Sequence, residues 1–240
     1  MRRRSFLRRS VAVAGSLALS SSALAGSVTA ETDPYDAQPE HVSLVYDESL
    51  LEEHVPRLVM SHLDVSPTAA YSWIATSTEH STDFYCYWVY YAYQEGYTEY
   101  DSHETDREPV LVEVNQDDEV VAVYYDAYHY LRNDPGTAPV RDGHPTLRIQ
   151  KPHHFYTATT AIGDMPDIGD LHEYYDAWID NDWRVYRPAV VDPWSMASRE
   201  HFWRDASAGV SFNAVYWRSL LAASSVPGID FGGASDSDLS

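Results

Sequence analysis

The sequence predicts a β-rich α+β fold, namely a single-domain β-sandwich with short peripheral helices that lie mostly in the C-terminal third. Three observations predict it. The 240 residues suffice for one domain with a substantial core. The 19 tyrosines and 7 tryptophans favour aromatic packing in sheets over a leucine-rich helical bundle. The hydrophobic period also changes after about residue 165, from one typical of strands to one typical of helices.

Strand patterns dominate the middle of the chain. Residues 57–63 predict a first strand, and residues 83–93 (DFYCYWVYYAY) are aromatic on both faces, which is typical of a central strand. Residues 108–114 and 120–131 flank the turn NQDDE and predict a β-hairpin. After a loop rich in proline and glycine, residues 146–150 are expected to continue the same sheet.

Helical patterns lie at the two ends of this strand-rich region. Residues 47–54 predict a short helix that ends before Pro56. Residues 170–179 and 198–206 suit short amphipathic helices, and residues 212–223 fit either a helix or a strand.

Composition divides the chain into four parts, with no internal repeat. We expect a twin-arginine signal peptide over 1–30, a flexible tether over 31–40, a β-sandwich-like domain over 41–226 and a disordered tail over 227–240.

The N-terminal segment has the pattern of an export signal. A mildly apolar stretch runs from Val11 to about Leu24, and Ala23 and Ala25 precede a suitable cleavage point. The run RRSFLR that begins at Arg3 resembles the twin-arginine signal, which carries folded proteins across a membrane. An uncleaved anchor helix is disfavoured because the stretch is short and rich in serine. We therefore expect an extracellular or cell-surface protein that uses the twin-arginine export machinery and has no transmembrane segment in its mature form.

The charge is strongly acidic, with 37 Asp and Glu against 16 Lys and Arg, and Lys151 is the only lysine. Such a chain repels nucleic acid and anionic membrane surfaces, so no nucleic-acid partner is expected. Together with an ordinary hydrophobic share of 44%, this acidity indicates adaptation to molar salt, where screening reduces self-repulsion. The single cysteine, Cys86, allows no intrachain disulfide and is expected to be a buried apolar residue.

Acidic residues gather where the strand at 108–114 begins. Alternation places Asp106 and Glu108 on one face, and desolvated carboxylates that close repel each other unless a cation or donor lies between them. His103 and Glu95 are near enough in sequence to add ligands. Three carboxylates and an imidazole suit a hard divalent ion such as Mg²⁺, Ca²⁺ or Mn²⁺. The alternative is a solvated acidic turn that binds nothing.

A family resemblance bears on this choice. The stretch YYAYQEGYTEYDSHETDREPVLVEV (90–114) resembles the centre of the necrosis- and ethylene-inducing-peptide-like (necrosis-inducing protein) family. That family's hallmark is Gly-His-Arg-His-Asp-Trp-Glu before a valine-rich strand, and a related vacuolar-sorting-associated domain has a similar core. The resemblance implies that the metal ligands are Glu95, His103, Asp106 and Glu108. It also places His129 and His154 (or His153) at the edge of the site.

The departures from the hallmark concern the family's active loop. They are Ser102 for the glycine, Glu104 for the arginine, Thr105 for the second histidine and Arg107 for the tryptophan. The paired cysteines of the family are absent as well. These losses favour metal binding over cytolytic activity.

The resemblance thus implies an exported, divalent-cation-dependent binding protein that recognises a polar headgroup or a glycan. A more specific version of this hypothesis is a toxin-like protein. One alternative is a secreted metal-dependent hydrolase, in which Asp106, Glu108 and Glu95 act with His129 or His154. No nucleophile elbow or His-Glu-x-x-His motif supports an enzyme. The other alternative is a cell-surface structural protein in which the cation only stabilises the hairpin and binds no ligand.

Overall fold

Two β-sheets and four short α-helices make up the part of the chain that the computed structural model describes, which is residues 37–96, 102–128, 130–179 and 183–203. The predicted β-rich α+β sandwich with mostly C-terminal helices is confirmed. The predicted signal peptide, the segment 212–223 and the predicted tail lie outside the described residues.

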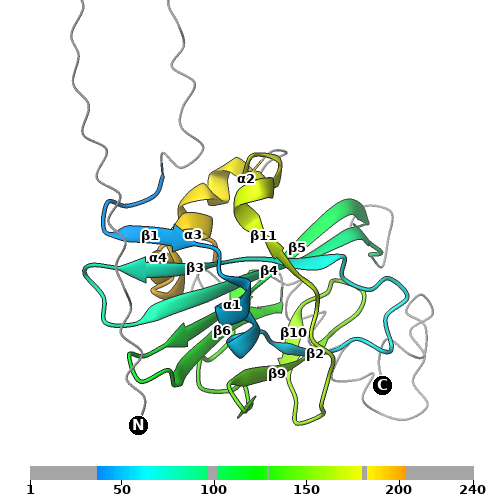
Figure 1. Ribbon diagram of the computed structural model, residues 1–240. Helices are drawn as coiled ribbons and strands as arrows, with labels where there is room; N and C mark the ends of the chain where they lie inside the picture. Colours follow the sequence, from blue (N-terminus) through cyan, green and yellow to red (C-terminus); the bar gives the residue numbers. More distant parts are fainter. Residues whose placement is uncertain (1–36, 97–101, 129, 180–182, 204–240) are drawn as a thin grey trace, which may run out of the picture. The chain divides into compact units, whose positions relative to one another are not determined.

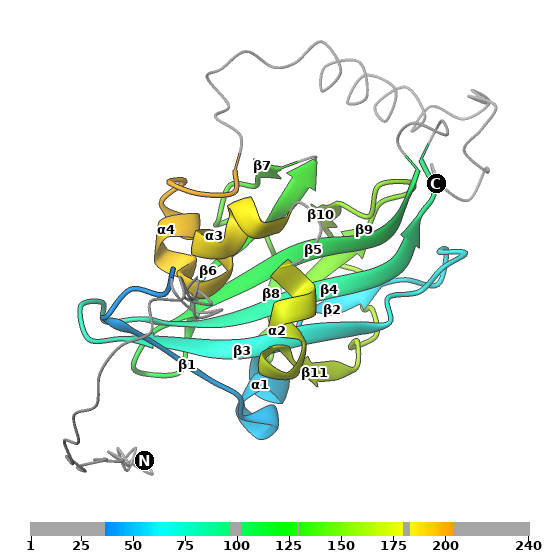
Figure 2. The same ribbon diagram turned by 90° about the horizontal axis from the view of Figure 1, so that it is seen from above.

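The larger sheet has the order β1-β3-β4-β5-β6-β7, with β11 beside β3 (Figures 1 and 2). Its strands are β1 (Val42–Val45), β3 (Ala69–Ser77), β4 (Asp83–Gln94), β5 (His103–Val114), β6 (Val120–Tyr128), β7 (Leu131–Arg132) and β11 (Ile168–Asp170). All pairs are antiparallel except β11 with β3. The aromatic run in β4 is central, as predicted, because β3 and β5 pair with it on either side.

The smaller sheet has the order β10-β9-β2, with β8 beside β9. Its strands are β2 (Arg57–Val59), β8 (Val140–Arg141), β9 (His144–Ile149) and β10 (Tyr156–Ala158). The prediction that residues 146–150 continue the first sheet is therefore wrong, because β9 pairs with β2 and β10 instead.

The helices are α1 (Glu48–His54), α2 (Leu171–Ile179), α3 (Arg187–Val191) and α4 (Pro193–Ala197), with a 3₁₀ turn η1 (Trp183–Tyr186). Asp47 caps α1, because its side chain accepts a hydrogen bond from the Leu50 N–H at 3.2 Å. The predicted helices at 47–54 and 170–179 are confirmed. The helix predicted at 198–206 is wrong for its described part, because residues 198–203 form turns and bends after α4. Among the described helices, none is long and apolar enough to cross a membrane.

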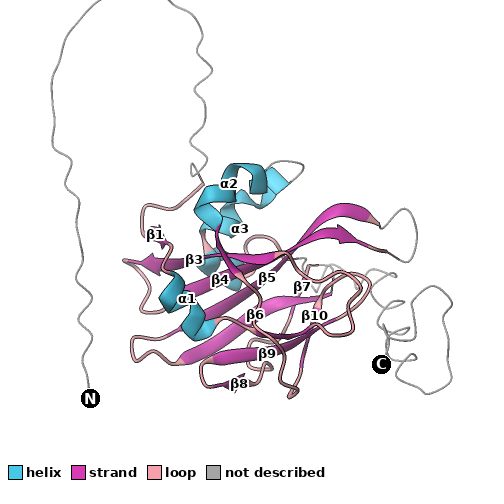
Figure 3. Ribbon diagram, turned by 45° about the vertical axis from the view of Figure 1, so that its right-hand side comes forward, coloured by secondary structure: helices cyan, strands magenta, loops and turns pink. Residues whose placement is uncertain are grey.

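Two cores lie on the two faces of the larger sheet. The smaller sheet lies on one side of this sheet and α2 and α3 on the other (Figures 1 and 3). The first core fills the space toward the smaller sheet and α1, and it includes Tyr87, Val110 and Leu147. The second core lies under α2, α3 and α4, and it includes Trp88 and Trp178. The larger sheet is therefore covered on both faces, which explains why β4 is apolar and aromatic throughout.

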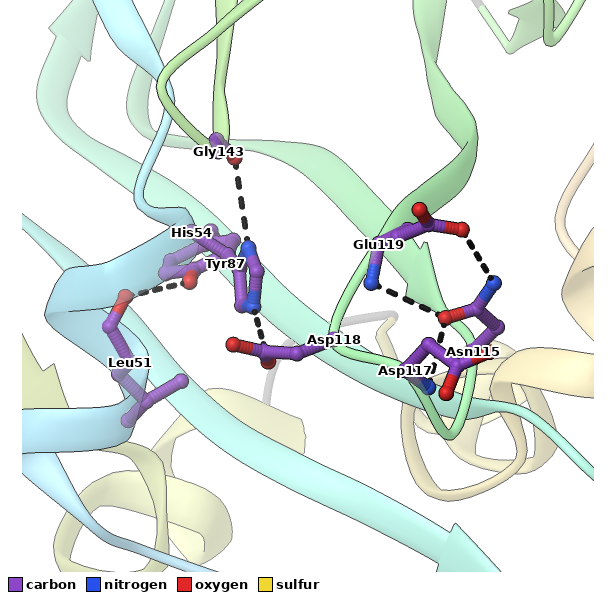
Figure 4. A network of polar contacts seen from close by, with 8 residues as sticks. All are labelled: Leu51, His54, Tyr87, Asn115, Asp117, Asp118, Glu119 and Gly143. Atoms are coloured by element: carbon purple, nitrogen blue, oxygen red, sulfur yellow. Dashed lines mark hydrogen bonds and ion pairs between the residues drawn. The ribbon is translucent and has the colours of Figure 1, made fainter. Parts of the chain in front are cut away.

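A polar network fixes α1 to two turns (Figure 4). The buried ring of His54 lies between the Gly143 carbonyl, at 3.3 Å from Nδ1, and the Asp118 carboxylate, at 3.2 Å from Nε2. The Tyr87 hydroxyl donates to the Leu51 carbonyl at 2.6 Å. These contacts tie α1 to the β5–β6 turn, to the β8–β9 turn and to the central strand.

Candidate functional site

The acidic group lies where β5 enters the first core. Asp106 pairs in register with Tyr91, and Glu108 pairs with Val89. Strand alternation places both carboxylates on the side of β5 that carries Val110, and each residue is only 8% exposed. Two acidic side chains are therefore held side by side with little water around them.

A third carboxylate, Asp126, comes from β6 and is 2% exposed. Its two oxygens accept hydrogen bonds from the Tyr128 and Tyr130 N–H groups, both at 2.8 Å. Its carboxyl group also interacts with that of Glu108. The Glu108 Oε2 atom is buried without a hydrogen-bond partner among the described residues.

Burial changes the acidity of this pair. Burial raises the pKa of Glu108 well above its usual range, and repulsion by Asp126 and Asp106 adds to the effect. Burial also raises the pKa of Asp126 to about 6, although the two backbone N–H donors oppose it. The Glu108–Asp126 pair thus keeps a proton to a higher pH than two solvated carboxylates would.

His154 connects this buried group to the surface. It lies in the loop between β9 and β10, is 5% exposed and has a φ of +53°, a region that residues other than glycine seldom adopt. Its ring stacks on Tyr91 with centroids 3.8 Å apart, and its Nδ1 donates to Asp106 Oδ2 at 2.8 Å. The loop is closed by the Gln150 N–H, which donates to the Phe155 carbonyl at 2.8 Å.

A small surface cavity of about 40 Å³ lies over His154. Its lining includes Asp64, Val65, Tyr93, Glu95, Lys151 and His154. The buried Lys151 ammonium donates to the exposed Asp64 carboxylate. The lining thus carries both charge signs beside an apolar and an aromatic side chain. The cavity itself has room for only a few water-sized groups, so a larger ligand would rest across its mouth, against the exposed Tyr93 and Val65.

The predicted metal ligands occupy different places. Asp106 and Glu108 lie together, and Glu95 is exposed at the cavity. His103 is exposed, with its Nε2 3.1 Å from the Gln94 amide nitrogen and its Nδ1 3.0 Å from the Thr105 carbonyl. Within the described ranges, no three His, Cys, Asp or Glu side chains are gathered closely enough to hold a metal ion.

His103 lies on the same continuous strand as Asp106 but three positions earlier, so alternation does not bring the two side chains to one face. Thr105, between them, has a φ of +61°, which is unusual for a β-branched residue. Of the histidines expected at the edge, His154 is in contact with Asp106, His153 is buried beside it, and His129 lies outside the described residues.

Asp126 is the member of the acidic group that sequence reasoning missed. It stands within VVAVYYDAYHY, an apolar and aromatic strand pattern, and a lone acid in such a pattern is a signal for a buried carboxyl group. Its proximity to Glu108 depends on the pairing of β5 with β6, which the residue pattern alone does not give.

Comparison with known proteins gives a distant likeness of fold. No protein-family model matches the chain, and no curated protein matches it. Two solved structures of NLPPya, a Nep1-like necrosis-inducing protein, are similar at 16% and 17% identity, one in complex with mannosamine and one with glucosamine. Each match covers 62% of this chain and 88% of the other, with a TM-score of 0.46. The likeness concerns the fold alone, and the sugars belong to those structures.

Proposed function

We propose that this chain is an exported binding protein that recognises a polar headgroup or a glycan at the cavity over His154. One observation carries the proposal: His154 lines the cavity and is hydrogen-bonded to Asp106, so the ligand site is joined to a buried acidic group. Exposed Tyr93 and Val65 at the same cavity offer apolar surface to a sugar ring, while Glu95 and Asp64 offer acceptors to hydroxyl or ammonium groups.

A divalent cation, Mg²⁺, Ca²⁺ or Mn²⁺, forms part of the proposal. The family resemblance implies Glu95, His103, Asp106 and Glu108 as its ligands; Asp106 and Glu108 already lie together on β5, whereas Glu95 and His103 would have to move toward them to complete the site. The buried Glu108 Oε2 atom, which lacks a hydrogen-bond partner among the described residues, is a fitting oxygen ligand for a hard cation. When bound, the cation would offset the repulsion between the carboxylates and supply a positive charge to the ligand's oxygens. Asp106 would then either give up its hydrogen bond with His154 or keep it while it also contacts the cation.

Calorimetric titration tests the cation. The secreted chain, freed of metal with a chelator at high salt, is titrated with Ca²⁺, Mg²⁺ or Mn²⁺. Asp106→Asn is expected to weaken binding by at least about 10-fold, because it removes a charged ligand. Glu113→Gln is the matched control on the same strand, because Glu113 bonds instead to the Thr82 and Tyr124 hydroxyls. Equal affinities of the two variants would contradict the metal assignment.

The ligand is tested with the same protein in the presence of the cation. Glucosamine, mannosamine and glucose serve as probes, and His154→Ala is expected to weaken saturable binding. The control is His80→Ala, because His80 is exposed and stacks on Trp194 at a centroid distance of 5.0 Å, away from the cavity residues. Leakage from vesicles that carry sugar headgroups would mark the toxin-like form. Binding that His154→Ala leaves intact would place the ligand elsewhere.

A secreted hydrolase is the second candidate, and the Glu108–Asp126 pair is the observation that favours it. A carboxyl group with a pKa near neutrality can act as a general acid or base, and the pKa of Asp126 is raised to about 6. Turnover of a panel of glycosides and esters that is lost in Asp126→Asn would select this function. Absence of turnover with intact sugar binding would leave the binding function.

Export through the twin-arginine pathway is also part of the proposal. Replacing Arg3 and Arg4 together by lysine is expected to abolish secretion, because the pathway reads the arginine pair rather than the charge. The measurement is the amount of protein in the medium and in the cell. Replacement of Arg8 and Arg9 by lysine is the control, and undiminished secretion of the Arg3/Arg4 variant would refute the assignment.

A further inference from the structure

Arg107 lies between the two acidic residues in sequence but faces the opposite side of β5. It is 6% exposed and pairs in register with Tyr90. Its guanidinium carbon lies 5.0 Å from the Trp178 ring centroid, 5.1 Å from that of Trp183 and 6.0 Å from that of Tyr90. A buried cation is therefore surrounded by aromatic rings from β4, α2 and η1.

The charge of Arg107 has no acidic partner in direct contact among the described residues, although the more distant Asp106 carboxylate attracts it. No hydrogen bond or ion pair of its guanidinium occurs there, and its Nε is fully enclosed without a partner. The buried Lys151 differs, since its ammonium group pairs with Asp64. In a chain with 37 acidic residues, a buried arginine without a carboxylate is unexpected, because an unpaired buried charge is unfavourable.

The aromatic rings satisfy only part of this cation. Ring faces attract a guanidinium group but accept no regular hydrogen bond from its N–H groups. The edge of the planar guanidinium fork remains as a set of donors, and this edge matches a planar or tetrahedral oxyanion that accepts two parallel hydrogen bonds. The aromatic rings also lower the polarity around the guanidinium group, which strengthens such a pair.

We propose that Arg107, Trp178, Trp183 and Tyr90 form a binding site for a small oxyanion, a carboxylate or a phosphate, on the helical side of the larger sheet. The site is separate from the cavity over His154, because it lies on the other face of β5. It needs neither a divalent cation nor a sugar.

Thermal unfolding with inorganic phosphate or acetate tests the proposal at constant ionic strength and in the presence of a chelator. About 20 mM phosphate is expected to raise the Tm of the protein by about 5 °C if the Kd is about 1 mM. The fluorescence of the tryptophans should change over the same concentrations, because Trp178 and Trp183 touch the guanidinium group.

Arg107→Met is the decisive variant. It is expected to fold, because an unbranched apolar side chain replaces an unpaired buried charge, and to lose both responses. Arg107→Lys should bind at least about 10-fold more weakly, because it keeps the charge but lacks the fork. Arg132→Met is the control, because Arg132 lies 5.2 Å from the Tyr124 centroid but donates to the Ala197 carbonyl.

The three proteins together distinguish a specific site from a general effect of the anions. The site is supported if phosphate or acetate raises the Tm of the natural protein and of Arg132→Met but not that of Arg107→Met. The anion that raises the Tm more then shows whether the site prefers a phosphate or a carboxylate. An equal rise in all three proteins, or no rise in the natural protein, overturns it. Sugar binding by Arg107→Met should remain, so a failure here leaves the function proposed for the cavity untouched.

Discussion

Replacing Glu108 by glutamine is expected to leave the free energy of unfolding nearly unchanged at about pH 5 and to increase it by about 2 kcal/mol at about pH 8, in the presence of a chelator. Glutamine has nearly the shape of a protonated glutamic acid, and its amide can donate to Asp126 as the acid would. The variant therefore reproduces the state in which the pair holds a proton, and it never acquires the buried negative charge.

The direction of the two pKa shifts determines how the free energy of unfolding changes with pH. Burial raises the pKa of Glu108 and brings that of Asp126 to about 6, so the folded state holds more protons than the unfolded state above the ordinary carboxyl pKa. Stability from this pair is fully present below about pH 4 and is lost as the pH rises through the folded-state values. For Asp126 alone, a change from 3.8 to about 6 corresponds to about 3 kcal/mol.

Urea denaturation at several pH values and constant high salt provides the measurement. The general repulsion among 37 acidic side chains also grows with pH, so only the difference between the natural protein and the variant is informative. Glu113→Gln removes one carboxylate from the same strand outside the buried pair and is the control. A difference between Glu108→Gln and the natural protein that does not change with pH would show that the pair is not protonated in the folded state.

Local pattern predicted much of the larger sheet. The aromatic residues 83–93 require cover on both faces, and the structure supplies it with the smaller sheet on one side and the helices on the other. The hairpin at 108–131 follows from two apolar runs around a polar turn, and its Asn115 side chain accepts hydrogen bonds from the Asp117 and Glu119 N–H groups at 2.9 and 3.0 Å. These features depend on residues near each other in sequence.

The assignment of strands to sheets could not be predicted in this way. Strand β9 has an ordinary apolar pattern, and its place in the smaller sheet depends on parallel pairing with β2, which lies almost 90 residues earlier. Strand β3 was missed because its sequence AAYSWIATS mixes small and polar residues, yet the helices and β4 bury most of it. In both strands, the position in the fold depends on pairing and packing partners that are distant in sequence.

The candidate site likewise combines features that local pattern predicts with features that depend on residues distant in sequence. The parity of Asp106 and Glu108 on β5 follows from alternation, and Arg107 lies on the other face for the same reason. The contact of His154 with Asp106 spans 48 positions and depends on a left-handed residue in a loop, while the contact of Asp126 depends on the β5–β6 register. His103 is three positions before Asp106 on the same continuous strand, so alternation alone does not place the two side chains on one face.

Replacing Gly163 by alanine is expected to lower the free energy of unfolding by about 3 kcal/mol, the upper range for inserting a group into filled space. A Cβ at Gly163 would lie 2.2 Å from both the carbonyl carbon and the oxygen of Leu58, and 2.5 Å from the Val59 nitrogen. These are backbone atoms, so no side-chain rotation relieves the contact. The chain must move, which breaks the hydrogen bonds of 2.8 and 3.0 Å between Leu58 and Asp164.

This displacement should reach the cavity, because β2 leads directly into Asp64 and Val65 in its lining. Gly163→Ala is therefore expected to weaken sugar binding as well as to lower the Tm. Gly136→Ala is the matched control, because a Cβ there meets nothing within 4 Å, and its stability should change by less than about 0.5 kcal/mol. Chemical denaturation of both variants gives the comparison. Equal stability of the two would mean that the segment at Gly163 moves away from β2 at little cost, and that the smaller sheet does not depend on this contact.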